Sequence, residues 1–577
     1  MKRTIITLLC IFSFCCYSCN NNGQTNKSEL PQKEKKPLIA LGQLWGFLKY
    51  HHPAVAAGNY DWDMELVKLI PSIREAKNEA QWKKILDNWL DSLPPVDKNA
   101  DKKLPDMEAK TKPDYGELFN PEYFNSETIE KIKFILDNAV ITANHYVTVN
   151  LNWKEGLPGL INITNEPAYE ELLYPDLSYR LLSLFRYWNI VNYFFPYRDL
   201  CDQKWSEMLA DFVYAENQEQ YVFTCLKLVA KTDDSHAFLG ENNLNQGLLK
   251  PPFETKFIED KLVVTMFTGE DANVKEKIKI GDVITAIDGE LVEDIVKELL
   301  PYTPASNYAV KLRRISAKIV TGNSNSATIT VLRDGKSFDV KASRYDMRQL
   351  HIPDYSNPHP EQEGYQILEN NIGYVLPSRC KVEDRNNGIK KVMSGTKGVI
   401  IDLRCYPSDY ISLPFLAYLN MTHTRFSLIS YANVSYPGYF FSFTNGKPDV
   451  EEKQASWYKN KIVVLVNEYT QSQAEDNVLG FQLIPNTVVI GSTTAGADGA
   501  IVGGIKDGKP PGFNLPGGLV TFFTGLGVYY PDGSDLQRIG VKIDEIVKPT
   551  IAGIKTGRDE VLERAIEIIE TDYNKVK

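Results

Sequence analysis

The side chain best placed for nucleophilic chemistry is Ser472. It follows an apolar run at 462–466, which is typical of a buried strand, and apolar residues after it recur at helical spacing. A serine at the start of a helix lies where backbone N–H groups and the positive helix end stabilise the oxyanion formed in acyl transfer. Ser472 and Glu475 also have the spacing of a capping box, so this motif alone leaves a purely structural role open.

The segment around Ser472 lies in a stretch, 365–570, in which strands and helices alternate. Apolar runs at 398–403, 462–466 and 488–491 predict strands that are covered on both faces. Helices are predicted from about 472 and over 559–571. We therefore expect a C-terminal α/β domain over 346–577.

Two earlier segments, 38–98 and 175–232, are expected to be copies of one helical unit. Shifting the first by 143 positions aligns six identities without a gap, and their helical spacing predicts a packing role for the aromatic residues. We expect an N-terminal helical domain with a mixed connecting segment over 38–174 and a second helical unit over 175–251. The identical pairs are Leu41 and Leu184, Trp45 and Trp188, Tyr50 and Tyr193, Pro53 and Pro196, Trp62 and Trp205, and Leu66 and Leu209.

Residues 252–345 are predicted to form a small β-rich domain, because short apolar strands are broken there by Gly-Asp and Asp-Gly turns. The string IKIGDVITAIDGELV at 278–292 resembles the central strands of PDZ domains in bacterial proteases. That resemblance implies that an extended peptide adds to the sheet edge and presents its C-terminal carboxylate to a loop. A small barrel without a ligand is the alternative.

The N-terminus has the pattern of an export signal. A basic start is followed by an apolar run over 5–17, too short to span a bilayer, and then by a polar, Asn-rich stretch. The end of the apolar run resembles a lipobox, which implies cleavage before Cys19 and lipidation of that cysteine. We expect a lipoprotein signal at 1–19, a polar tether at 20–37, and an exported protein anchored by lipid in the cell envelope rather than the cytoplasm. An ordinary cleaved signal is the alternative.

Composition excludes other classes of partner and site. The net charge is -10 and no basic cluster recurs on one face, which argues against nucleic acid as a partner. Beyond the predicted signal, no CxxC pair or His/Cys cluster suggests zinc. Four of the eight cysteines lie beyond the signal; they are too far apart for a disulfide scaffold, although they could form one bridge. These are Cys201, Cys225, Cys380 and Cys405, and we expect the last two to be packed thiols.

Several ordered motifs resemble the C-terminal-processing (tail-specific) and tricorn-like serine peptidases. The resemblance covers about 175–570 and implies a multidomain α+β protein whose C-terminal domain has the tail-specific protease (ClpP/crotonase-like) fold. It implies a serine peptidase with Ser472 as nucleophile, a polypeptide substrate, and no metal or organic cofactor. The motifs are KTDDSHAFL at 231–239, KGVIIDLR at 397–404, VLVNEYTQSQAE at 464–475, VVIGSTTAG at 488–496 and GGLVTFFTGLGVYYPDGSDLQRIGVKID at 517–544.

The resemblance also selects the base, which a serine hydroxyl needs in order to attack. The tail-specific branch uses a lysine, but Ala497 stands at that position. The tricorn-like branch uses a histidine preceded by a serine, which corresponds to Ser235 and His236. Of the seven histidines, His236 alone stands in such a motif, so it is the implied base and Ser235 an orienting residue. A hydrogen-bonded structural histidine is the alternative.

One departure from the family pattern concerns the acid behind the base. Gln537 stands at the position of that acid. An amide can orient a neighbouring hydroxyl or imidazole but cannot stabilise an imidazolium by charge. Asp532 and Asp535 lie nearby in the sequence as substitutes, although their spacing does not match.

A second departure concerns the oxyanion hole. The family has a glycine-rich loop after the IDLR strand, and this chain has Cys-Tyr-Pro-Ser-Asp over 405–409. Glycine lets a backbone approach the reacting carbonyl closely, so the substituted loop is more restricted. We expect the hole to use the N–H of Gln473, next to the nucleophile, with that of Ser408 or Asp409.

The sequence therefore predicts an exported serine peptidase that acts by Ser-His acyl transfer and recruits polypeptide tails through a PDZ-like domain. A peptide-binding protein that keeps the fold with weak or no turnover is the main alternative, supported by the two departures. A hydrolase for another acyl substrate, such as an ester, is the third. Neither the cleavage preference nor the oligomeric state follows from these patterns.

Overall fold

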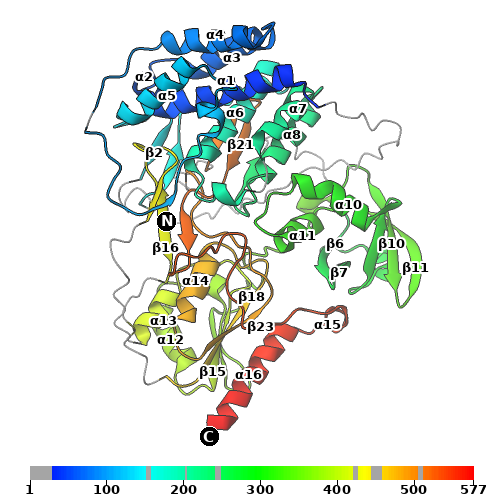
Figure 1. The fold of residues 1–577 in the computed structure, drawn as a ribbon. Helices are drawn as coiled ribbons and strands as arrows, with labels where there is room; N and C mark the ends of the chain where they lie inside the picture. Colours follow the sequence, from blue (N-terminus) through cyan, green and yellow to red (C-terminus); the bar gives the residue numbers. More distant parts are fainter. Residues whose placement is uncertain are drawn as a thin grey trace.

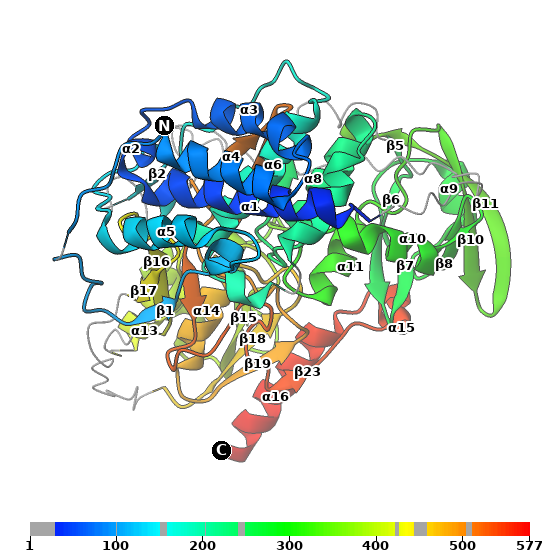
Figure 2. The ribbon, with the colours of Figure 1, turned by 45° about the horizontal axis from the view of Figure 1, so that its top comes forward.

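A computed structural model describes residues 29–99, 101–150, 158–201, 204–240, 249–419, 421, 426–442, 458–503 and 511–576. It contains a helical body formed by α1 to α8, a β-rich body formed around β6 to β11, and a C-terminal sheet flanked by helices. The last of these helices, α16, is the final element of the chain (Figures 1 and 2). Among the described residues no helix is long and apolar enough to cross a bilayer. Cys19 and the rest of the predicted signal lie outside the described residues.

The helical body has helices in both copies of the predicted repeat. In the first copy the indole N–H groups of Trp45 and Trp62 each donate to the other residue's backbone carbonyl, at 2.9 and 3.0 Å. These reciprocal bonds join the first helix of the copy to the helix that begins at Trp62. The helices are α1 (Gln32–His51), α2 (Pro53–Ala56), α3 (Trp62–Arg74) and α4 (Glu79–Asp91), then α5 (Ser126–Asn138), and α6 (Leu177–Phe194), α7 (Leu209–Val213) and α8 (Gln218–Ala230).

The two copies pack through a close crossing of α1 and α6. A Cβ at Gly46 would lie 1.8 Å from the side chain of Asn189, so only glycine allows this approach. Asn189 donates to the carbonyl of Gly42 at 3.0 Å and ties the crossing together. Because α1 begins at Gln32 and Leu30 is only 4% exposed, the tether predicted for 20–37 is wrong over its last residues. The reason is that Leu30 extends the apolar face of α1 into the core.

The β-rich body contains a sheet of order β11-β10-β8-β7-β6, with β9 paired to β8. Tight turns connect its hairpins; at the β6–β7 turn Asp260 has a φ of 59°. One helix of this body, α11, faces the rest of the protein and reaches the candidate site. The elements are β6 (Phe253–Ile258), β7 (Lys261–Phe267), α9 (Ala272–Lys277), β8 (Val283–Ile287), β9 (Glu290–Leu291), α10 (Val292–Leu299), α11 (Tyr308–Ser316), β10 (Ser326–Arg333) and β11 (Lys336–Ser343).

The C-terminal sheet confirms the predicted α/β domain. Its order is β13-β14-β15-β18-β19-β23, and the strands from β14 to β23 are parallel. Val399 and Ile401 pack with α12, α13 and α14 on one face, whereas Ile400 packs with α16 on the other, so both faces are covered. The elements are β13 (Tyr365–Ile367), β14 (Gly373–Val375), α12 (Arg385–Met393), β15 (Gly398–Asp402), α13 (Ser412–Tyr418), β18 (Lys461–Val466), α14 (Gln473–Gln482), β19 (Thr487–Gly491), β23 (Glu545–Ile546) and α16 (Glu560–Val576).

The chain returns from the C-terminal sheet to the helical body through two small antiparallel sheets. One has the order β20-β21-β4, in which β21 pairs with the strand that directly follows His236. The other has the order β1-β17-β16-β22. These pairings bring residues after 511 beside residues before 241. The strands are β1 (Ala109–Thr111), β4 (Phe238–Gly240), β16 (Leu428–Ala432), β17 (Phe440–Ser442), β20 (Phe513–Leu515), β21 (Leu519–Phe522) and β22 (Gly527–Tyr529).

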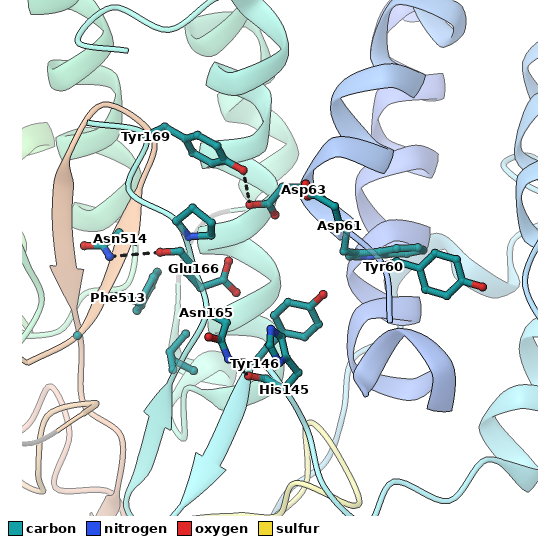
Figure 3. Close-up of a pocket in the computed structure, with 14 residues that line it drawn as sticks. Tyr60, Asp61, Asp63, His145, Tyr146, Asn165, Glu166, Tyr169, Phe513 and Asn514 are labelled. Carbon is teal, nitrogen blue, oxygen red and sulfur yellow. Dashed lines mark hydrogen bonds between the residues drawn. The ribbon is translucent and has the colours of Figure 1, made fainter. Parts of the chain in front are cut away.

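A buried network of charges holds this junction together; Figure 3 shows its two acids, Asp63 and Glu166, where they line a pocket. Glu166 pairs with Lys49 at 2.6 Å and with Arg186 at 2.8 Å, and Arg186 also pairs with Asp63. Arg186 donates to the carbonyl of Asn514 in β20 at 2.8 Å, so both helical copies and the returning strand share one cluster. The network borders a cavity of about 630 Å³, but its buried charges neutralise one another. We therefore assign it a structural role.

Candidate active site

Ser472 lies at the junction of β18 and α14 in a strained conformation. Its φ is 58° and its ψ is -128°, a region that a residue with a Cβ rarely adopts. A strained serine between a strand and a helix is typical of nucleophile elbows, which expose the hydroxyl. Its hydroxyl donates to the carbonyl of Gly499 at 3.2 Å rather than capping α14, so the capping-box alternative is wrong.

Glu475, the other residue of that capping-box spacing, holds the neighbouring loop. Its carboxyl group accepts from the hydroxyl of Thr494 at 2.6 Å and from the backbone N–H groups of Gly496 and Ala497 at 2.8 and 2.9 Å. Burial raises the pKa of Glu475 to about 7, and these hydrogen bonds partly oppose the rise. The loop is thereby fixed beside Ser472, whose own N–H donates to the carbonyl of Ala497 at 2.8 Å.

His236 is joined to a buried carboxylate through a threonine. The hydroxyl of Thr524 donates to Asp234 at 3.0 Å and lies 2.8 Å from Nδ1 of His236. A threonine has one hydroxyl proton, so in this arrangement Nδ1 of His236 carries a proton and donates it to Thr524. The neutral imidazole then has its lone pair on Nε2, the atom that a general base uses in a serine triad.

Asp234 is completely buried and is satisfied by other donors as well. It accepts from the backbone N–H of Thr524 at 2.7 Å and from that of His236 at 3.0 Å. These bonds fix the carboxylate and the histidine in one rigid unit. Burial lowers the pKa of His236, the charge of Asp234 opposes this effect, and Arg314 adds to it. The imidazole is therefore neutral at neutral pH and able to accept a proton.

The structure brings His236 and Ser472 to the same cavity. It has a volume of about 850 Å³, and Gln473 lines it with them. Gln473 is the first residue of α14, where a backbone N–H has no partner within the helix. A nucleophile, a neutral base and a backbone donor therefore meet in one space, as acyl transfer requires.

Ser235 and Gln537 lie behind this unit rather than within it. The hydroxyl of Ser235 donates to the carbonyl of Ala495 at 3.1 Å and accepts from the N–H of Ser306 at 2.9 Å, so the prediction that it orients His236 is wrong. Its side chain is used to join the histidine loop to α11 and to the loop after β19. Gln537 donates to Asp234 at 3.4 Å, which makes it a partner of the acid and not its replacement.

The predicted second oxyanion donors are displaced. The N–H of Ser408 donates to the carbonyl of Pro377 at 3.0 Å, and Asp409 forms an ion pair with Arg385. Neither residue is among the described residues that line the cavity, so their prediction as donors is wrong; the N–H of Ser408 is used within the loop instead. Tyr406 lines the cavity instead, and a hydrogen bond with Ser472 opposes the rise in its pKa that burial causes.

Three residues of this site were not predicted from the sequence. Asp234 and Thr524 lie inside the motifs at 231–239 and 517–544, and Tyr406 lies in the loop that was recognised only for its missing glycines. The signal for Asp234 was its position two residues before His236, where a side chain can accept the histidine's own N–H. Nothing in local spacing pointed to Thr524, because it is 288 positions from His236.

The cysteines take no part in the site. Within the described residues Cys201, Cys225, Cys380 and Cys405 form no disulfide bond. Burial raises the pKa of both Cys380 and Cys405 to about 12, so neither is a thiolate at neutral pH. The expectation of packed thiols at these two positions is confirmed.

Comparison with known proteins agrees with the geometry. Residues 371–547 match the model of peptidase family S41, and no curated protein matches the chain. Among solved structures, a single-residue variant of CPAF is 13% identical and has a TM-score of 0.50, covering 69% of this chain and 98% of that one. The photosystem II D1 C-terminal processing protease is 15% identical over 64% and 93% of the two chains, with a TM-score of 0.33.

The tricorn protease is also similar, at 15% identity over 69% of this chain and 37% of that one, with a TM-score of 0.33. At such identities the likeness concerns the fold alone, and the CPAF variant is the one whose TM-score supports it. The family match covers the strand before Ser472, the serine itself and Gln537. We conclude that residues 371–547, which include Ser472, match peptidase family S41.

Proposed function

We propose that this protein hydrolyses peptide bonds in polypeptides by acyl transfer to Ser472, with His236 as the general base. The observation that carries the proposal is the chain Asp234–Thr524–His236, which ends at the cavity that Ser472 lines. It supplies the negative charge that the sequence lacks at position 537. An imidazolium formed during catalysis is stabilised by that charge through the threonine hydroxyl.

The reaction follows from these contacts. Nε2 of His236 takes the hydroxyl proton of Ser472 as the oxygen attacks the scissile carbonyl. The oxyanion accepts hydrogen bonds from the N–H of Gln473 and from the phenol of Tyr406, and the positive end of α14 adds to them. The imidazolium then protonates the leaving amine, and a water molecule, deprotonated by the same histidine, releases the acyl group and frees Ser472.

The β-rich body is proposed to receive the substrate as a PDZ-like domain and to transmit its occupancy to the site. This proposal is supported by α11, which is bonded to the catalytic loops. Arg313 donates to the carbonyl of Glu468 and, at 3.1 Å, to the side chain of Gln471. Asn307 donates to the carbonyl of Thr494 at 2.8 Å. A displacement of α11 would therefore move the segments on both sides of Ser472.

A fluorophosphonate probe tests the proposal on the purified protein. We expect covalent labelling that is lost in Ser472→Ala, and a fall in labelling rate and peptide turnover of at least about 100-fold in His236→Ala. Folding of both variants is checked by thermal melting. A folded wild-type protein without labelling and without activity on a mixed peptide library would contradict the proposal and favour a peptide-binding role.

Export and lipid anchoring are part of the same proposal and rest on the N-terminal pattern at 1–19. We expect labelled palmitate to be incorporated into the full chain in a bacterial host and to be lost in Cys19→Ala. Equal labelling of the two proteins would place the lipid on another residue.

A further inference from the structure

The cavity at Ser472 has an acidic wall that the proposed reaction does not use. Asp476 lies on α14, one turn after the nucleophile, and Asp498 precedes Gly499, whose carbonyl accepts the hydroxyl of Ser472. Both aspartates line the cavity. The two aspartates therefore line the same cavity as the serine that attacks the substrate.

Within the part of the chain that the structure describes, no cation pairs with these carboxyl groups. Asp498 is 4% exposed, and its Oδ2 has no hydrogen-bond partner among the described residues; Oδ1 of Asp476 is also unpartnered. Burial raises the pKa of Asp476 to about 6. It raises that of Asp498 well above its ordinary value, and the nearby charges of Asp476 and Glu475 raise it further. A buried carboxylate without a partner is costly, so its retention needs a reason.

Other buried acids in the described part of the chain show what Asp498 lacks. Five of these acids, named below, form an ion pair with a lysine or arginine. Asp234 and Glu475 have no such cation among the described residues and accept several hydrogen bonds instead. Asp498 instead accepts a single bond, from the N–H of Gly499 at 2.6 Å. The paired acids are Asp63 and Glu166 with Arg186, Glu254 with Lys250, Asp282 with Arg333, and Asp402 with Arg404.

Arg313, the arginine among the described residues that line the cavity, is already engaged. Arg313 donates to Glu468 and Gln471, and its guanidinium lies 5.2 Å from the centre of the Tyr469 ring. His236 is neutral. Tyr406 and Tyr410 line the cavity and are 44% and 39% exposed; burial raises the pKa of Tyr410, and the charges of both aspartates raise it further. Carboxylates framed by aromatic rings attract an ammonium or guanidinium group.

We infer that Asp498 and Asp476 form a subsite for a cationic group of the substrate next to the scissile bond. This inference rests on the proposed peptidase function and states which substrates it prefers, namely those with a cationic group near the scissile bond. The cation is an ammonium or guanidinium group, from either a lysine or arginine side chain or the N-terminal amine of a peptide. On binding it pairs with the carboxylates, which offsets the cost of their burial.

Matched peptides test this subsite. One series carries arginine, citrulline or norleucine at a single position within an otherwise neutral, N-acetylated peptide, so that citrulline keeps the shape of arginine without its charge. A second series has neutral side chains and either a free or an acetylated N-terminus. In one of the two series we expect kcat/KM to be at least tenfold higher for the charged peptide than for its neutral counterparts. The series that shows this difference identifies whether the bound cation is a side chain or the N-terminal amine.

The variants compared are Asp498→Asn, Asp476→Asn and, as a control, Asp260→Asn. Asp260 is an exposed acid in the β6–β7 turn, where asparagine accepts the same positive φ. We expect the arginine-to-citrulline ratio, or the corresponding N-terminal ratio, to fall at least tenfold in Asp498→Asn and to stay at the wild-type value in the control. Equal cleavage of charged and neutral peptides by the wild type, in both series, would overturn the inference while leaving the peptidase function in place.

A binding measurement separates the inference from catalysis. Calorimetric titration of Ser472→Ala with benzamidine, an aromatic cation, reports on the subsite even if no peptide is cleaved. We expect binding that weakens at least tenfold when Asp498→Asn is added to Ser472→Ala, and that is unchanged when Asp260→Asn is added. Benzamidine binding of equal strength in all three proteins, or its absence from all, would contradict the inference independently of the labelling result for Ser472.

Discussion

Replacing Gln537 by glutamate restores the acid that the family carries at this position, yet the structure predicts a loss of activity. Nε2 of Gln537 lies 3.4 Å from the carboxylate of Asp234. Glutamate would place a second carboxylate at about that distance and remove the amide donor. The site would then hold two like charges where it now holds one charge and a partner for it.

The size of the effect follows from comparing two free energies. Two unit charges at this distance repel by about 5 kcal/mol at an effective dielectric constant of about 20. Keeping a glutamate protonated at pH 7 costs about 4 kcal/mol, because its ordinary pKa is near 4.3. The repulsion is the larger, so the two carboxyl groups share one proton at neutral pH. We expect kcat/KM to fall about 10- to 100-fold, because the shared proton divides the single negative charge between the two carboxyl groups and so withdraws part of it from Asp234; losing the charge behind a catalytic histidine altogether costs up to about 10⁴-fold.

The assay is the pH dependence of kcat/KM for the wild type, Gln537→Glu and Gln537→Met. The glutamate variant should regain activity as the pH rises from 7 to 9, because the shared proton leaves. Methionine removes the amide without adding charge, so its loss should be smaller and independent of pH in this range. Thermal melting verifies that both variants fold. Activity of Gln537→Glu at or above the wild-type level at pH 7 would refute the assignment of Asp234 as the acid of the relay.

Three further predictions test other parts of the molecule. Tyr406→Phe removes the phenolic donor and should lower kcat about 10- to 1000-fold with little change in KM; an unchanged kcat would leave the oxyanion to backbone donors alone. Burial lowers the pKa of His236 below its ordinary 6.5, and the base must be unprotonated to act. As the pH is lowered, kcat/KM should therefore stay constant down to pH 6.5 and decrease only at lower pH; a midpoint above pH 6.5 would contradict a buried base. Arg186→Met leaves two buried carboxylates without their shared partner and should lower the free energy of unfolding by about 3–5 kcal/mol, measured by urea denaturation; a change within 1 kcal/mol would show that the network is not required for stability.

Much of the fold could be predicted because its signals are local. The apolar runs around 400, 464 and 489 indicated strands covered on both faces, and β15, β18 and β19 lie there. The strand-to-helix change at Ser472 indicated where a nucleophile would stand. The paired tryptophans indicated a repeated helical unit, because a helix buries residues at a fixed spacing.

Patterns among neighbouring residues were therefore enough to place most strands and helices and to single out Ser472. The side chains that surround the serine are set by contacts between segments far apart in the chain. Pairing of β21 with β4 carries Thr524 to His236, and the turn after β15 aims Tyr406, rather than Ser408, at the cavity. The reason is physical: a hydrogen bond or a buried charge depends on distance and solvent exclusion, which contacts between distant segments create.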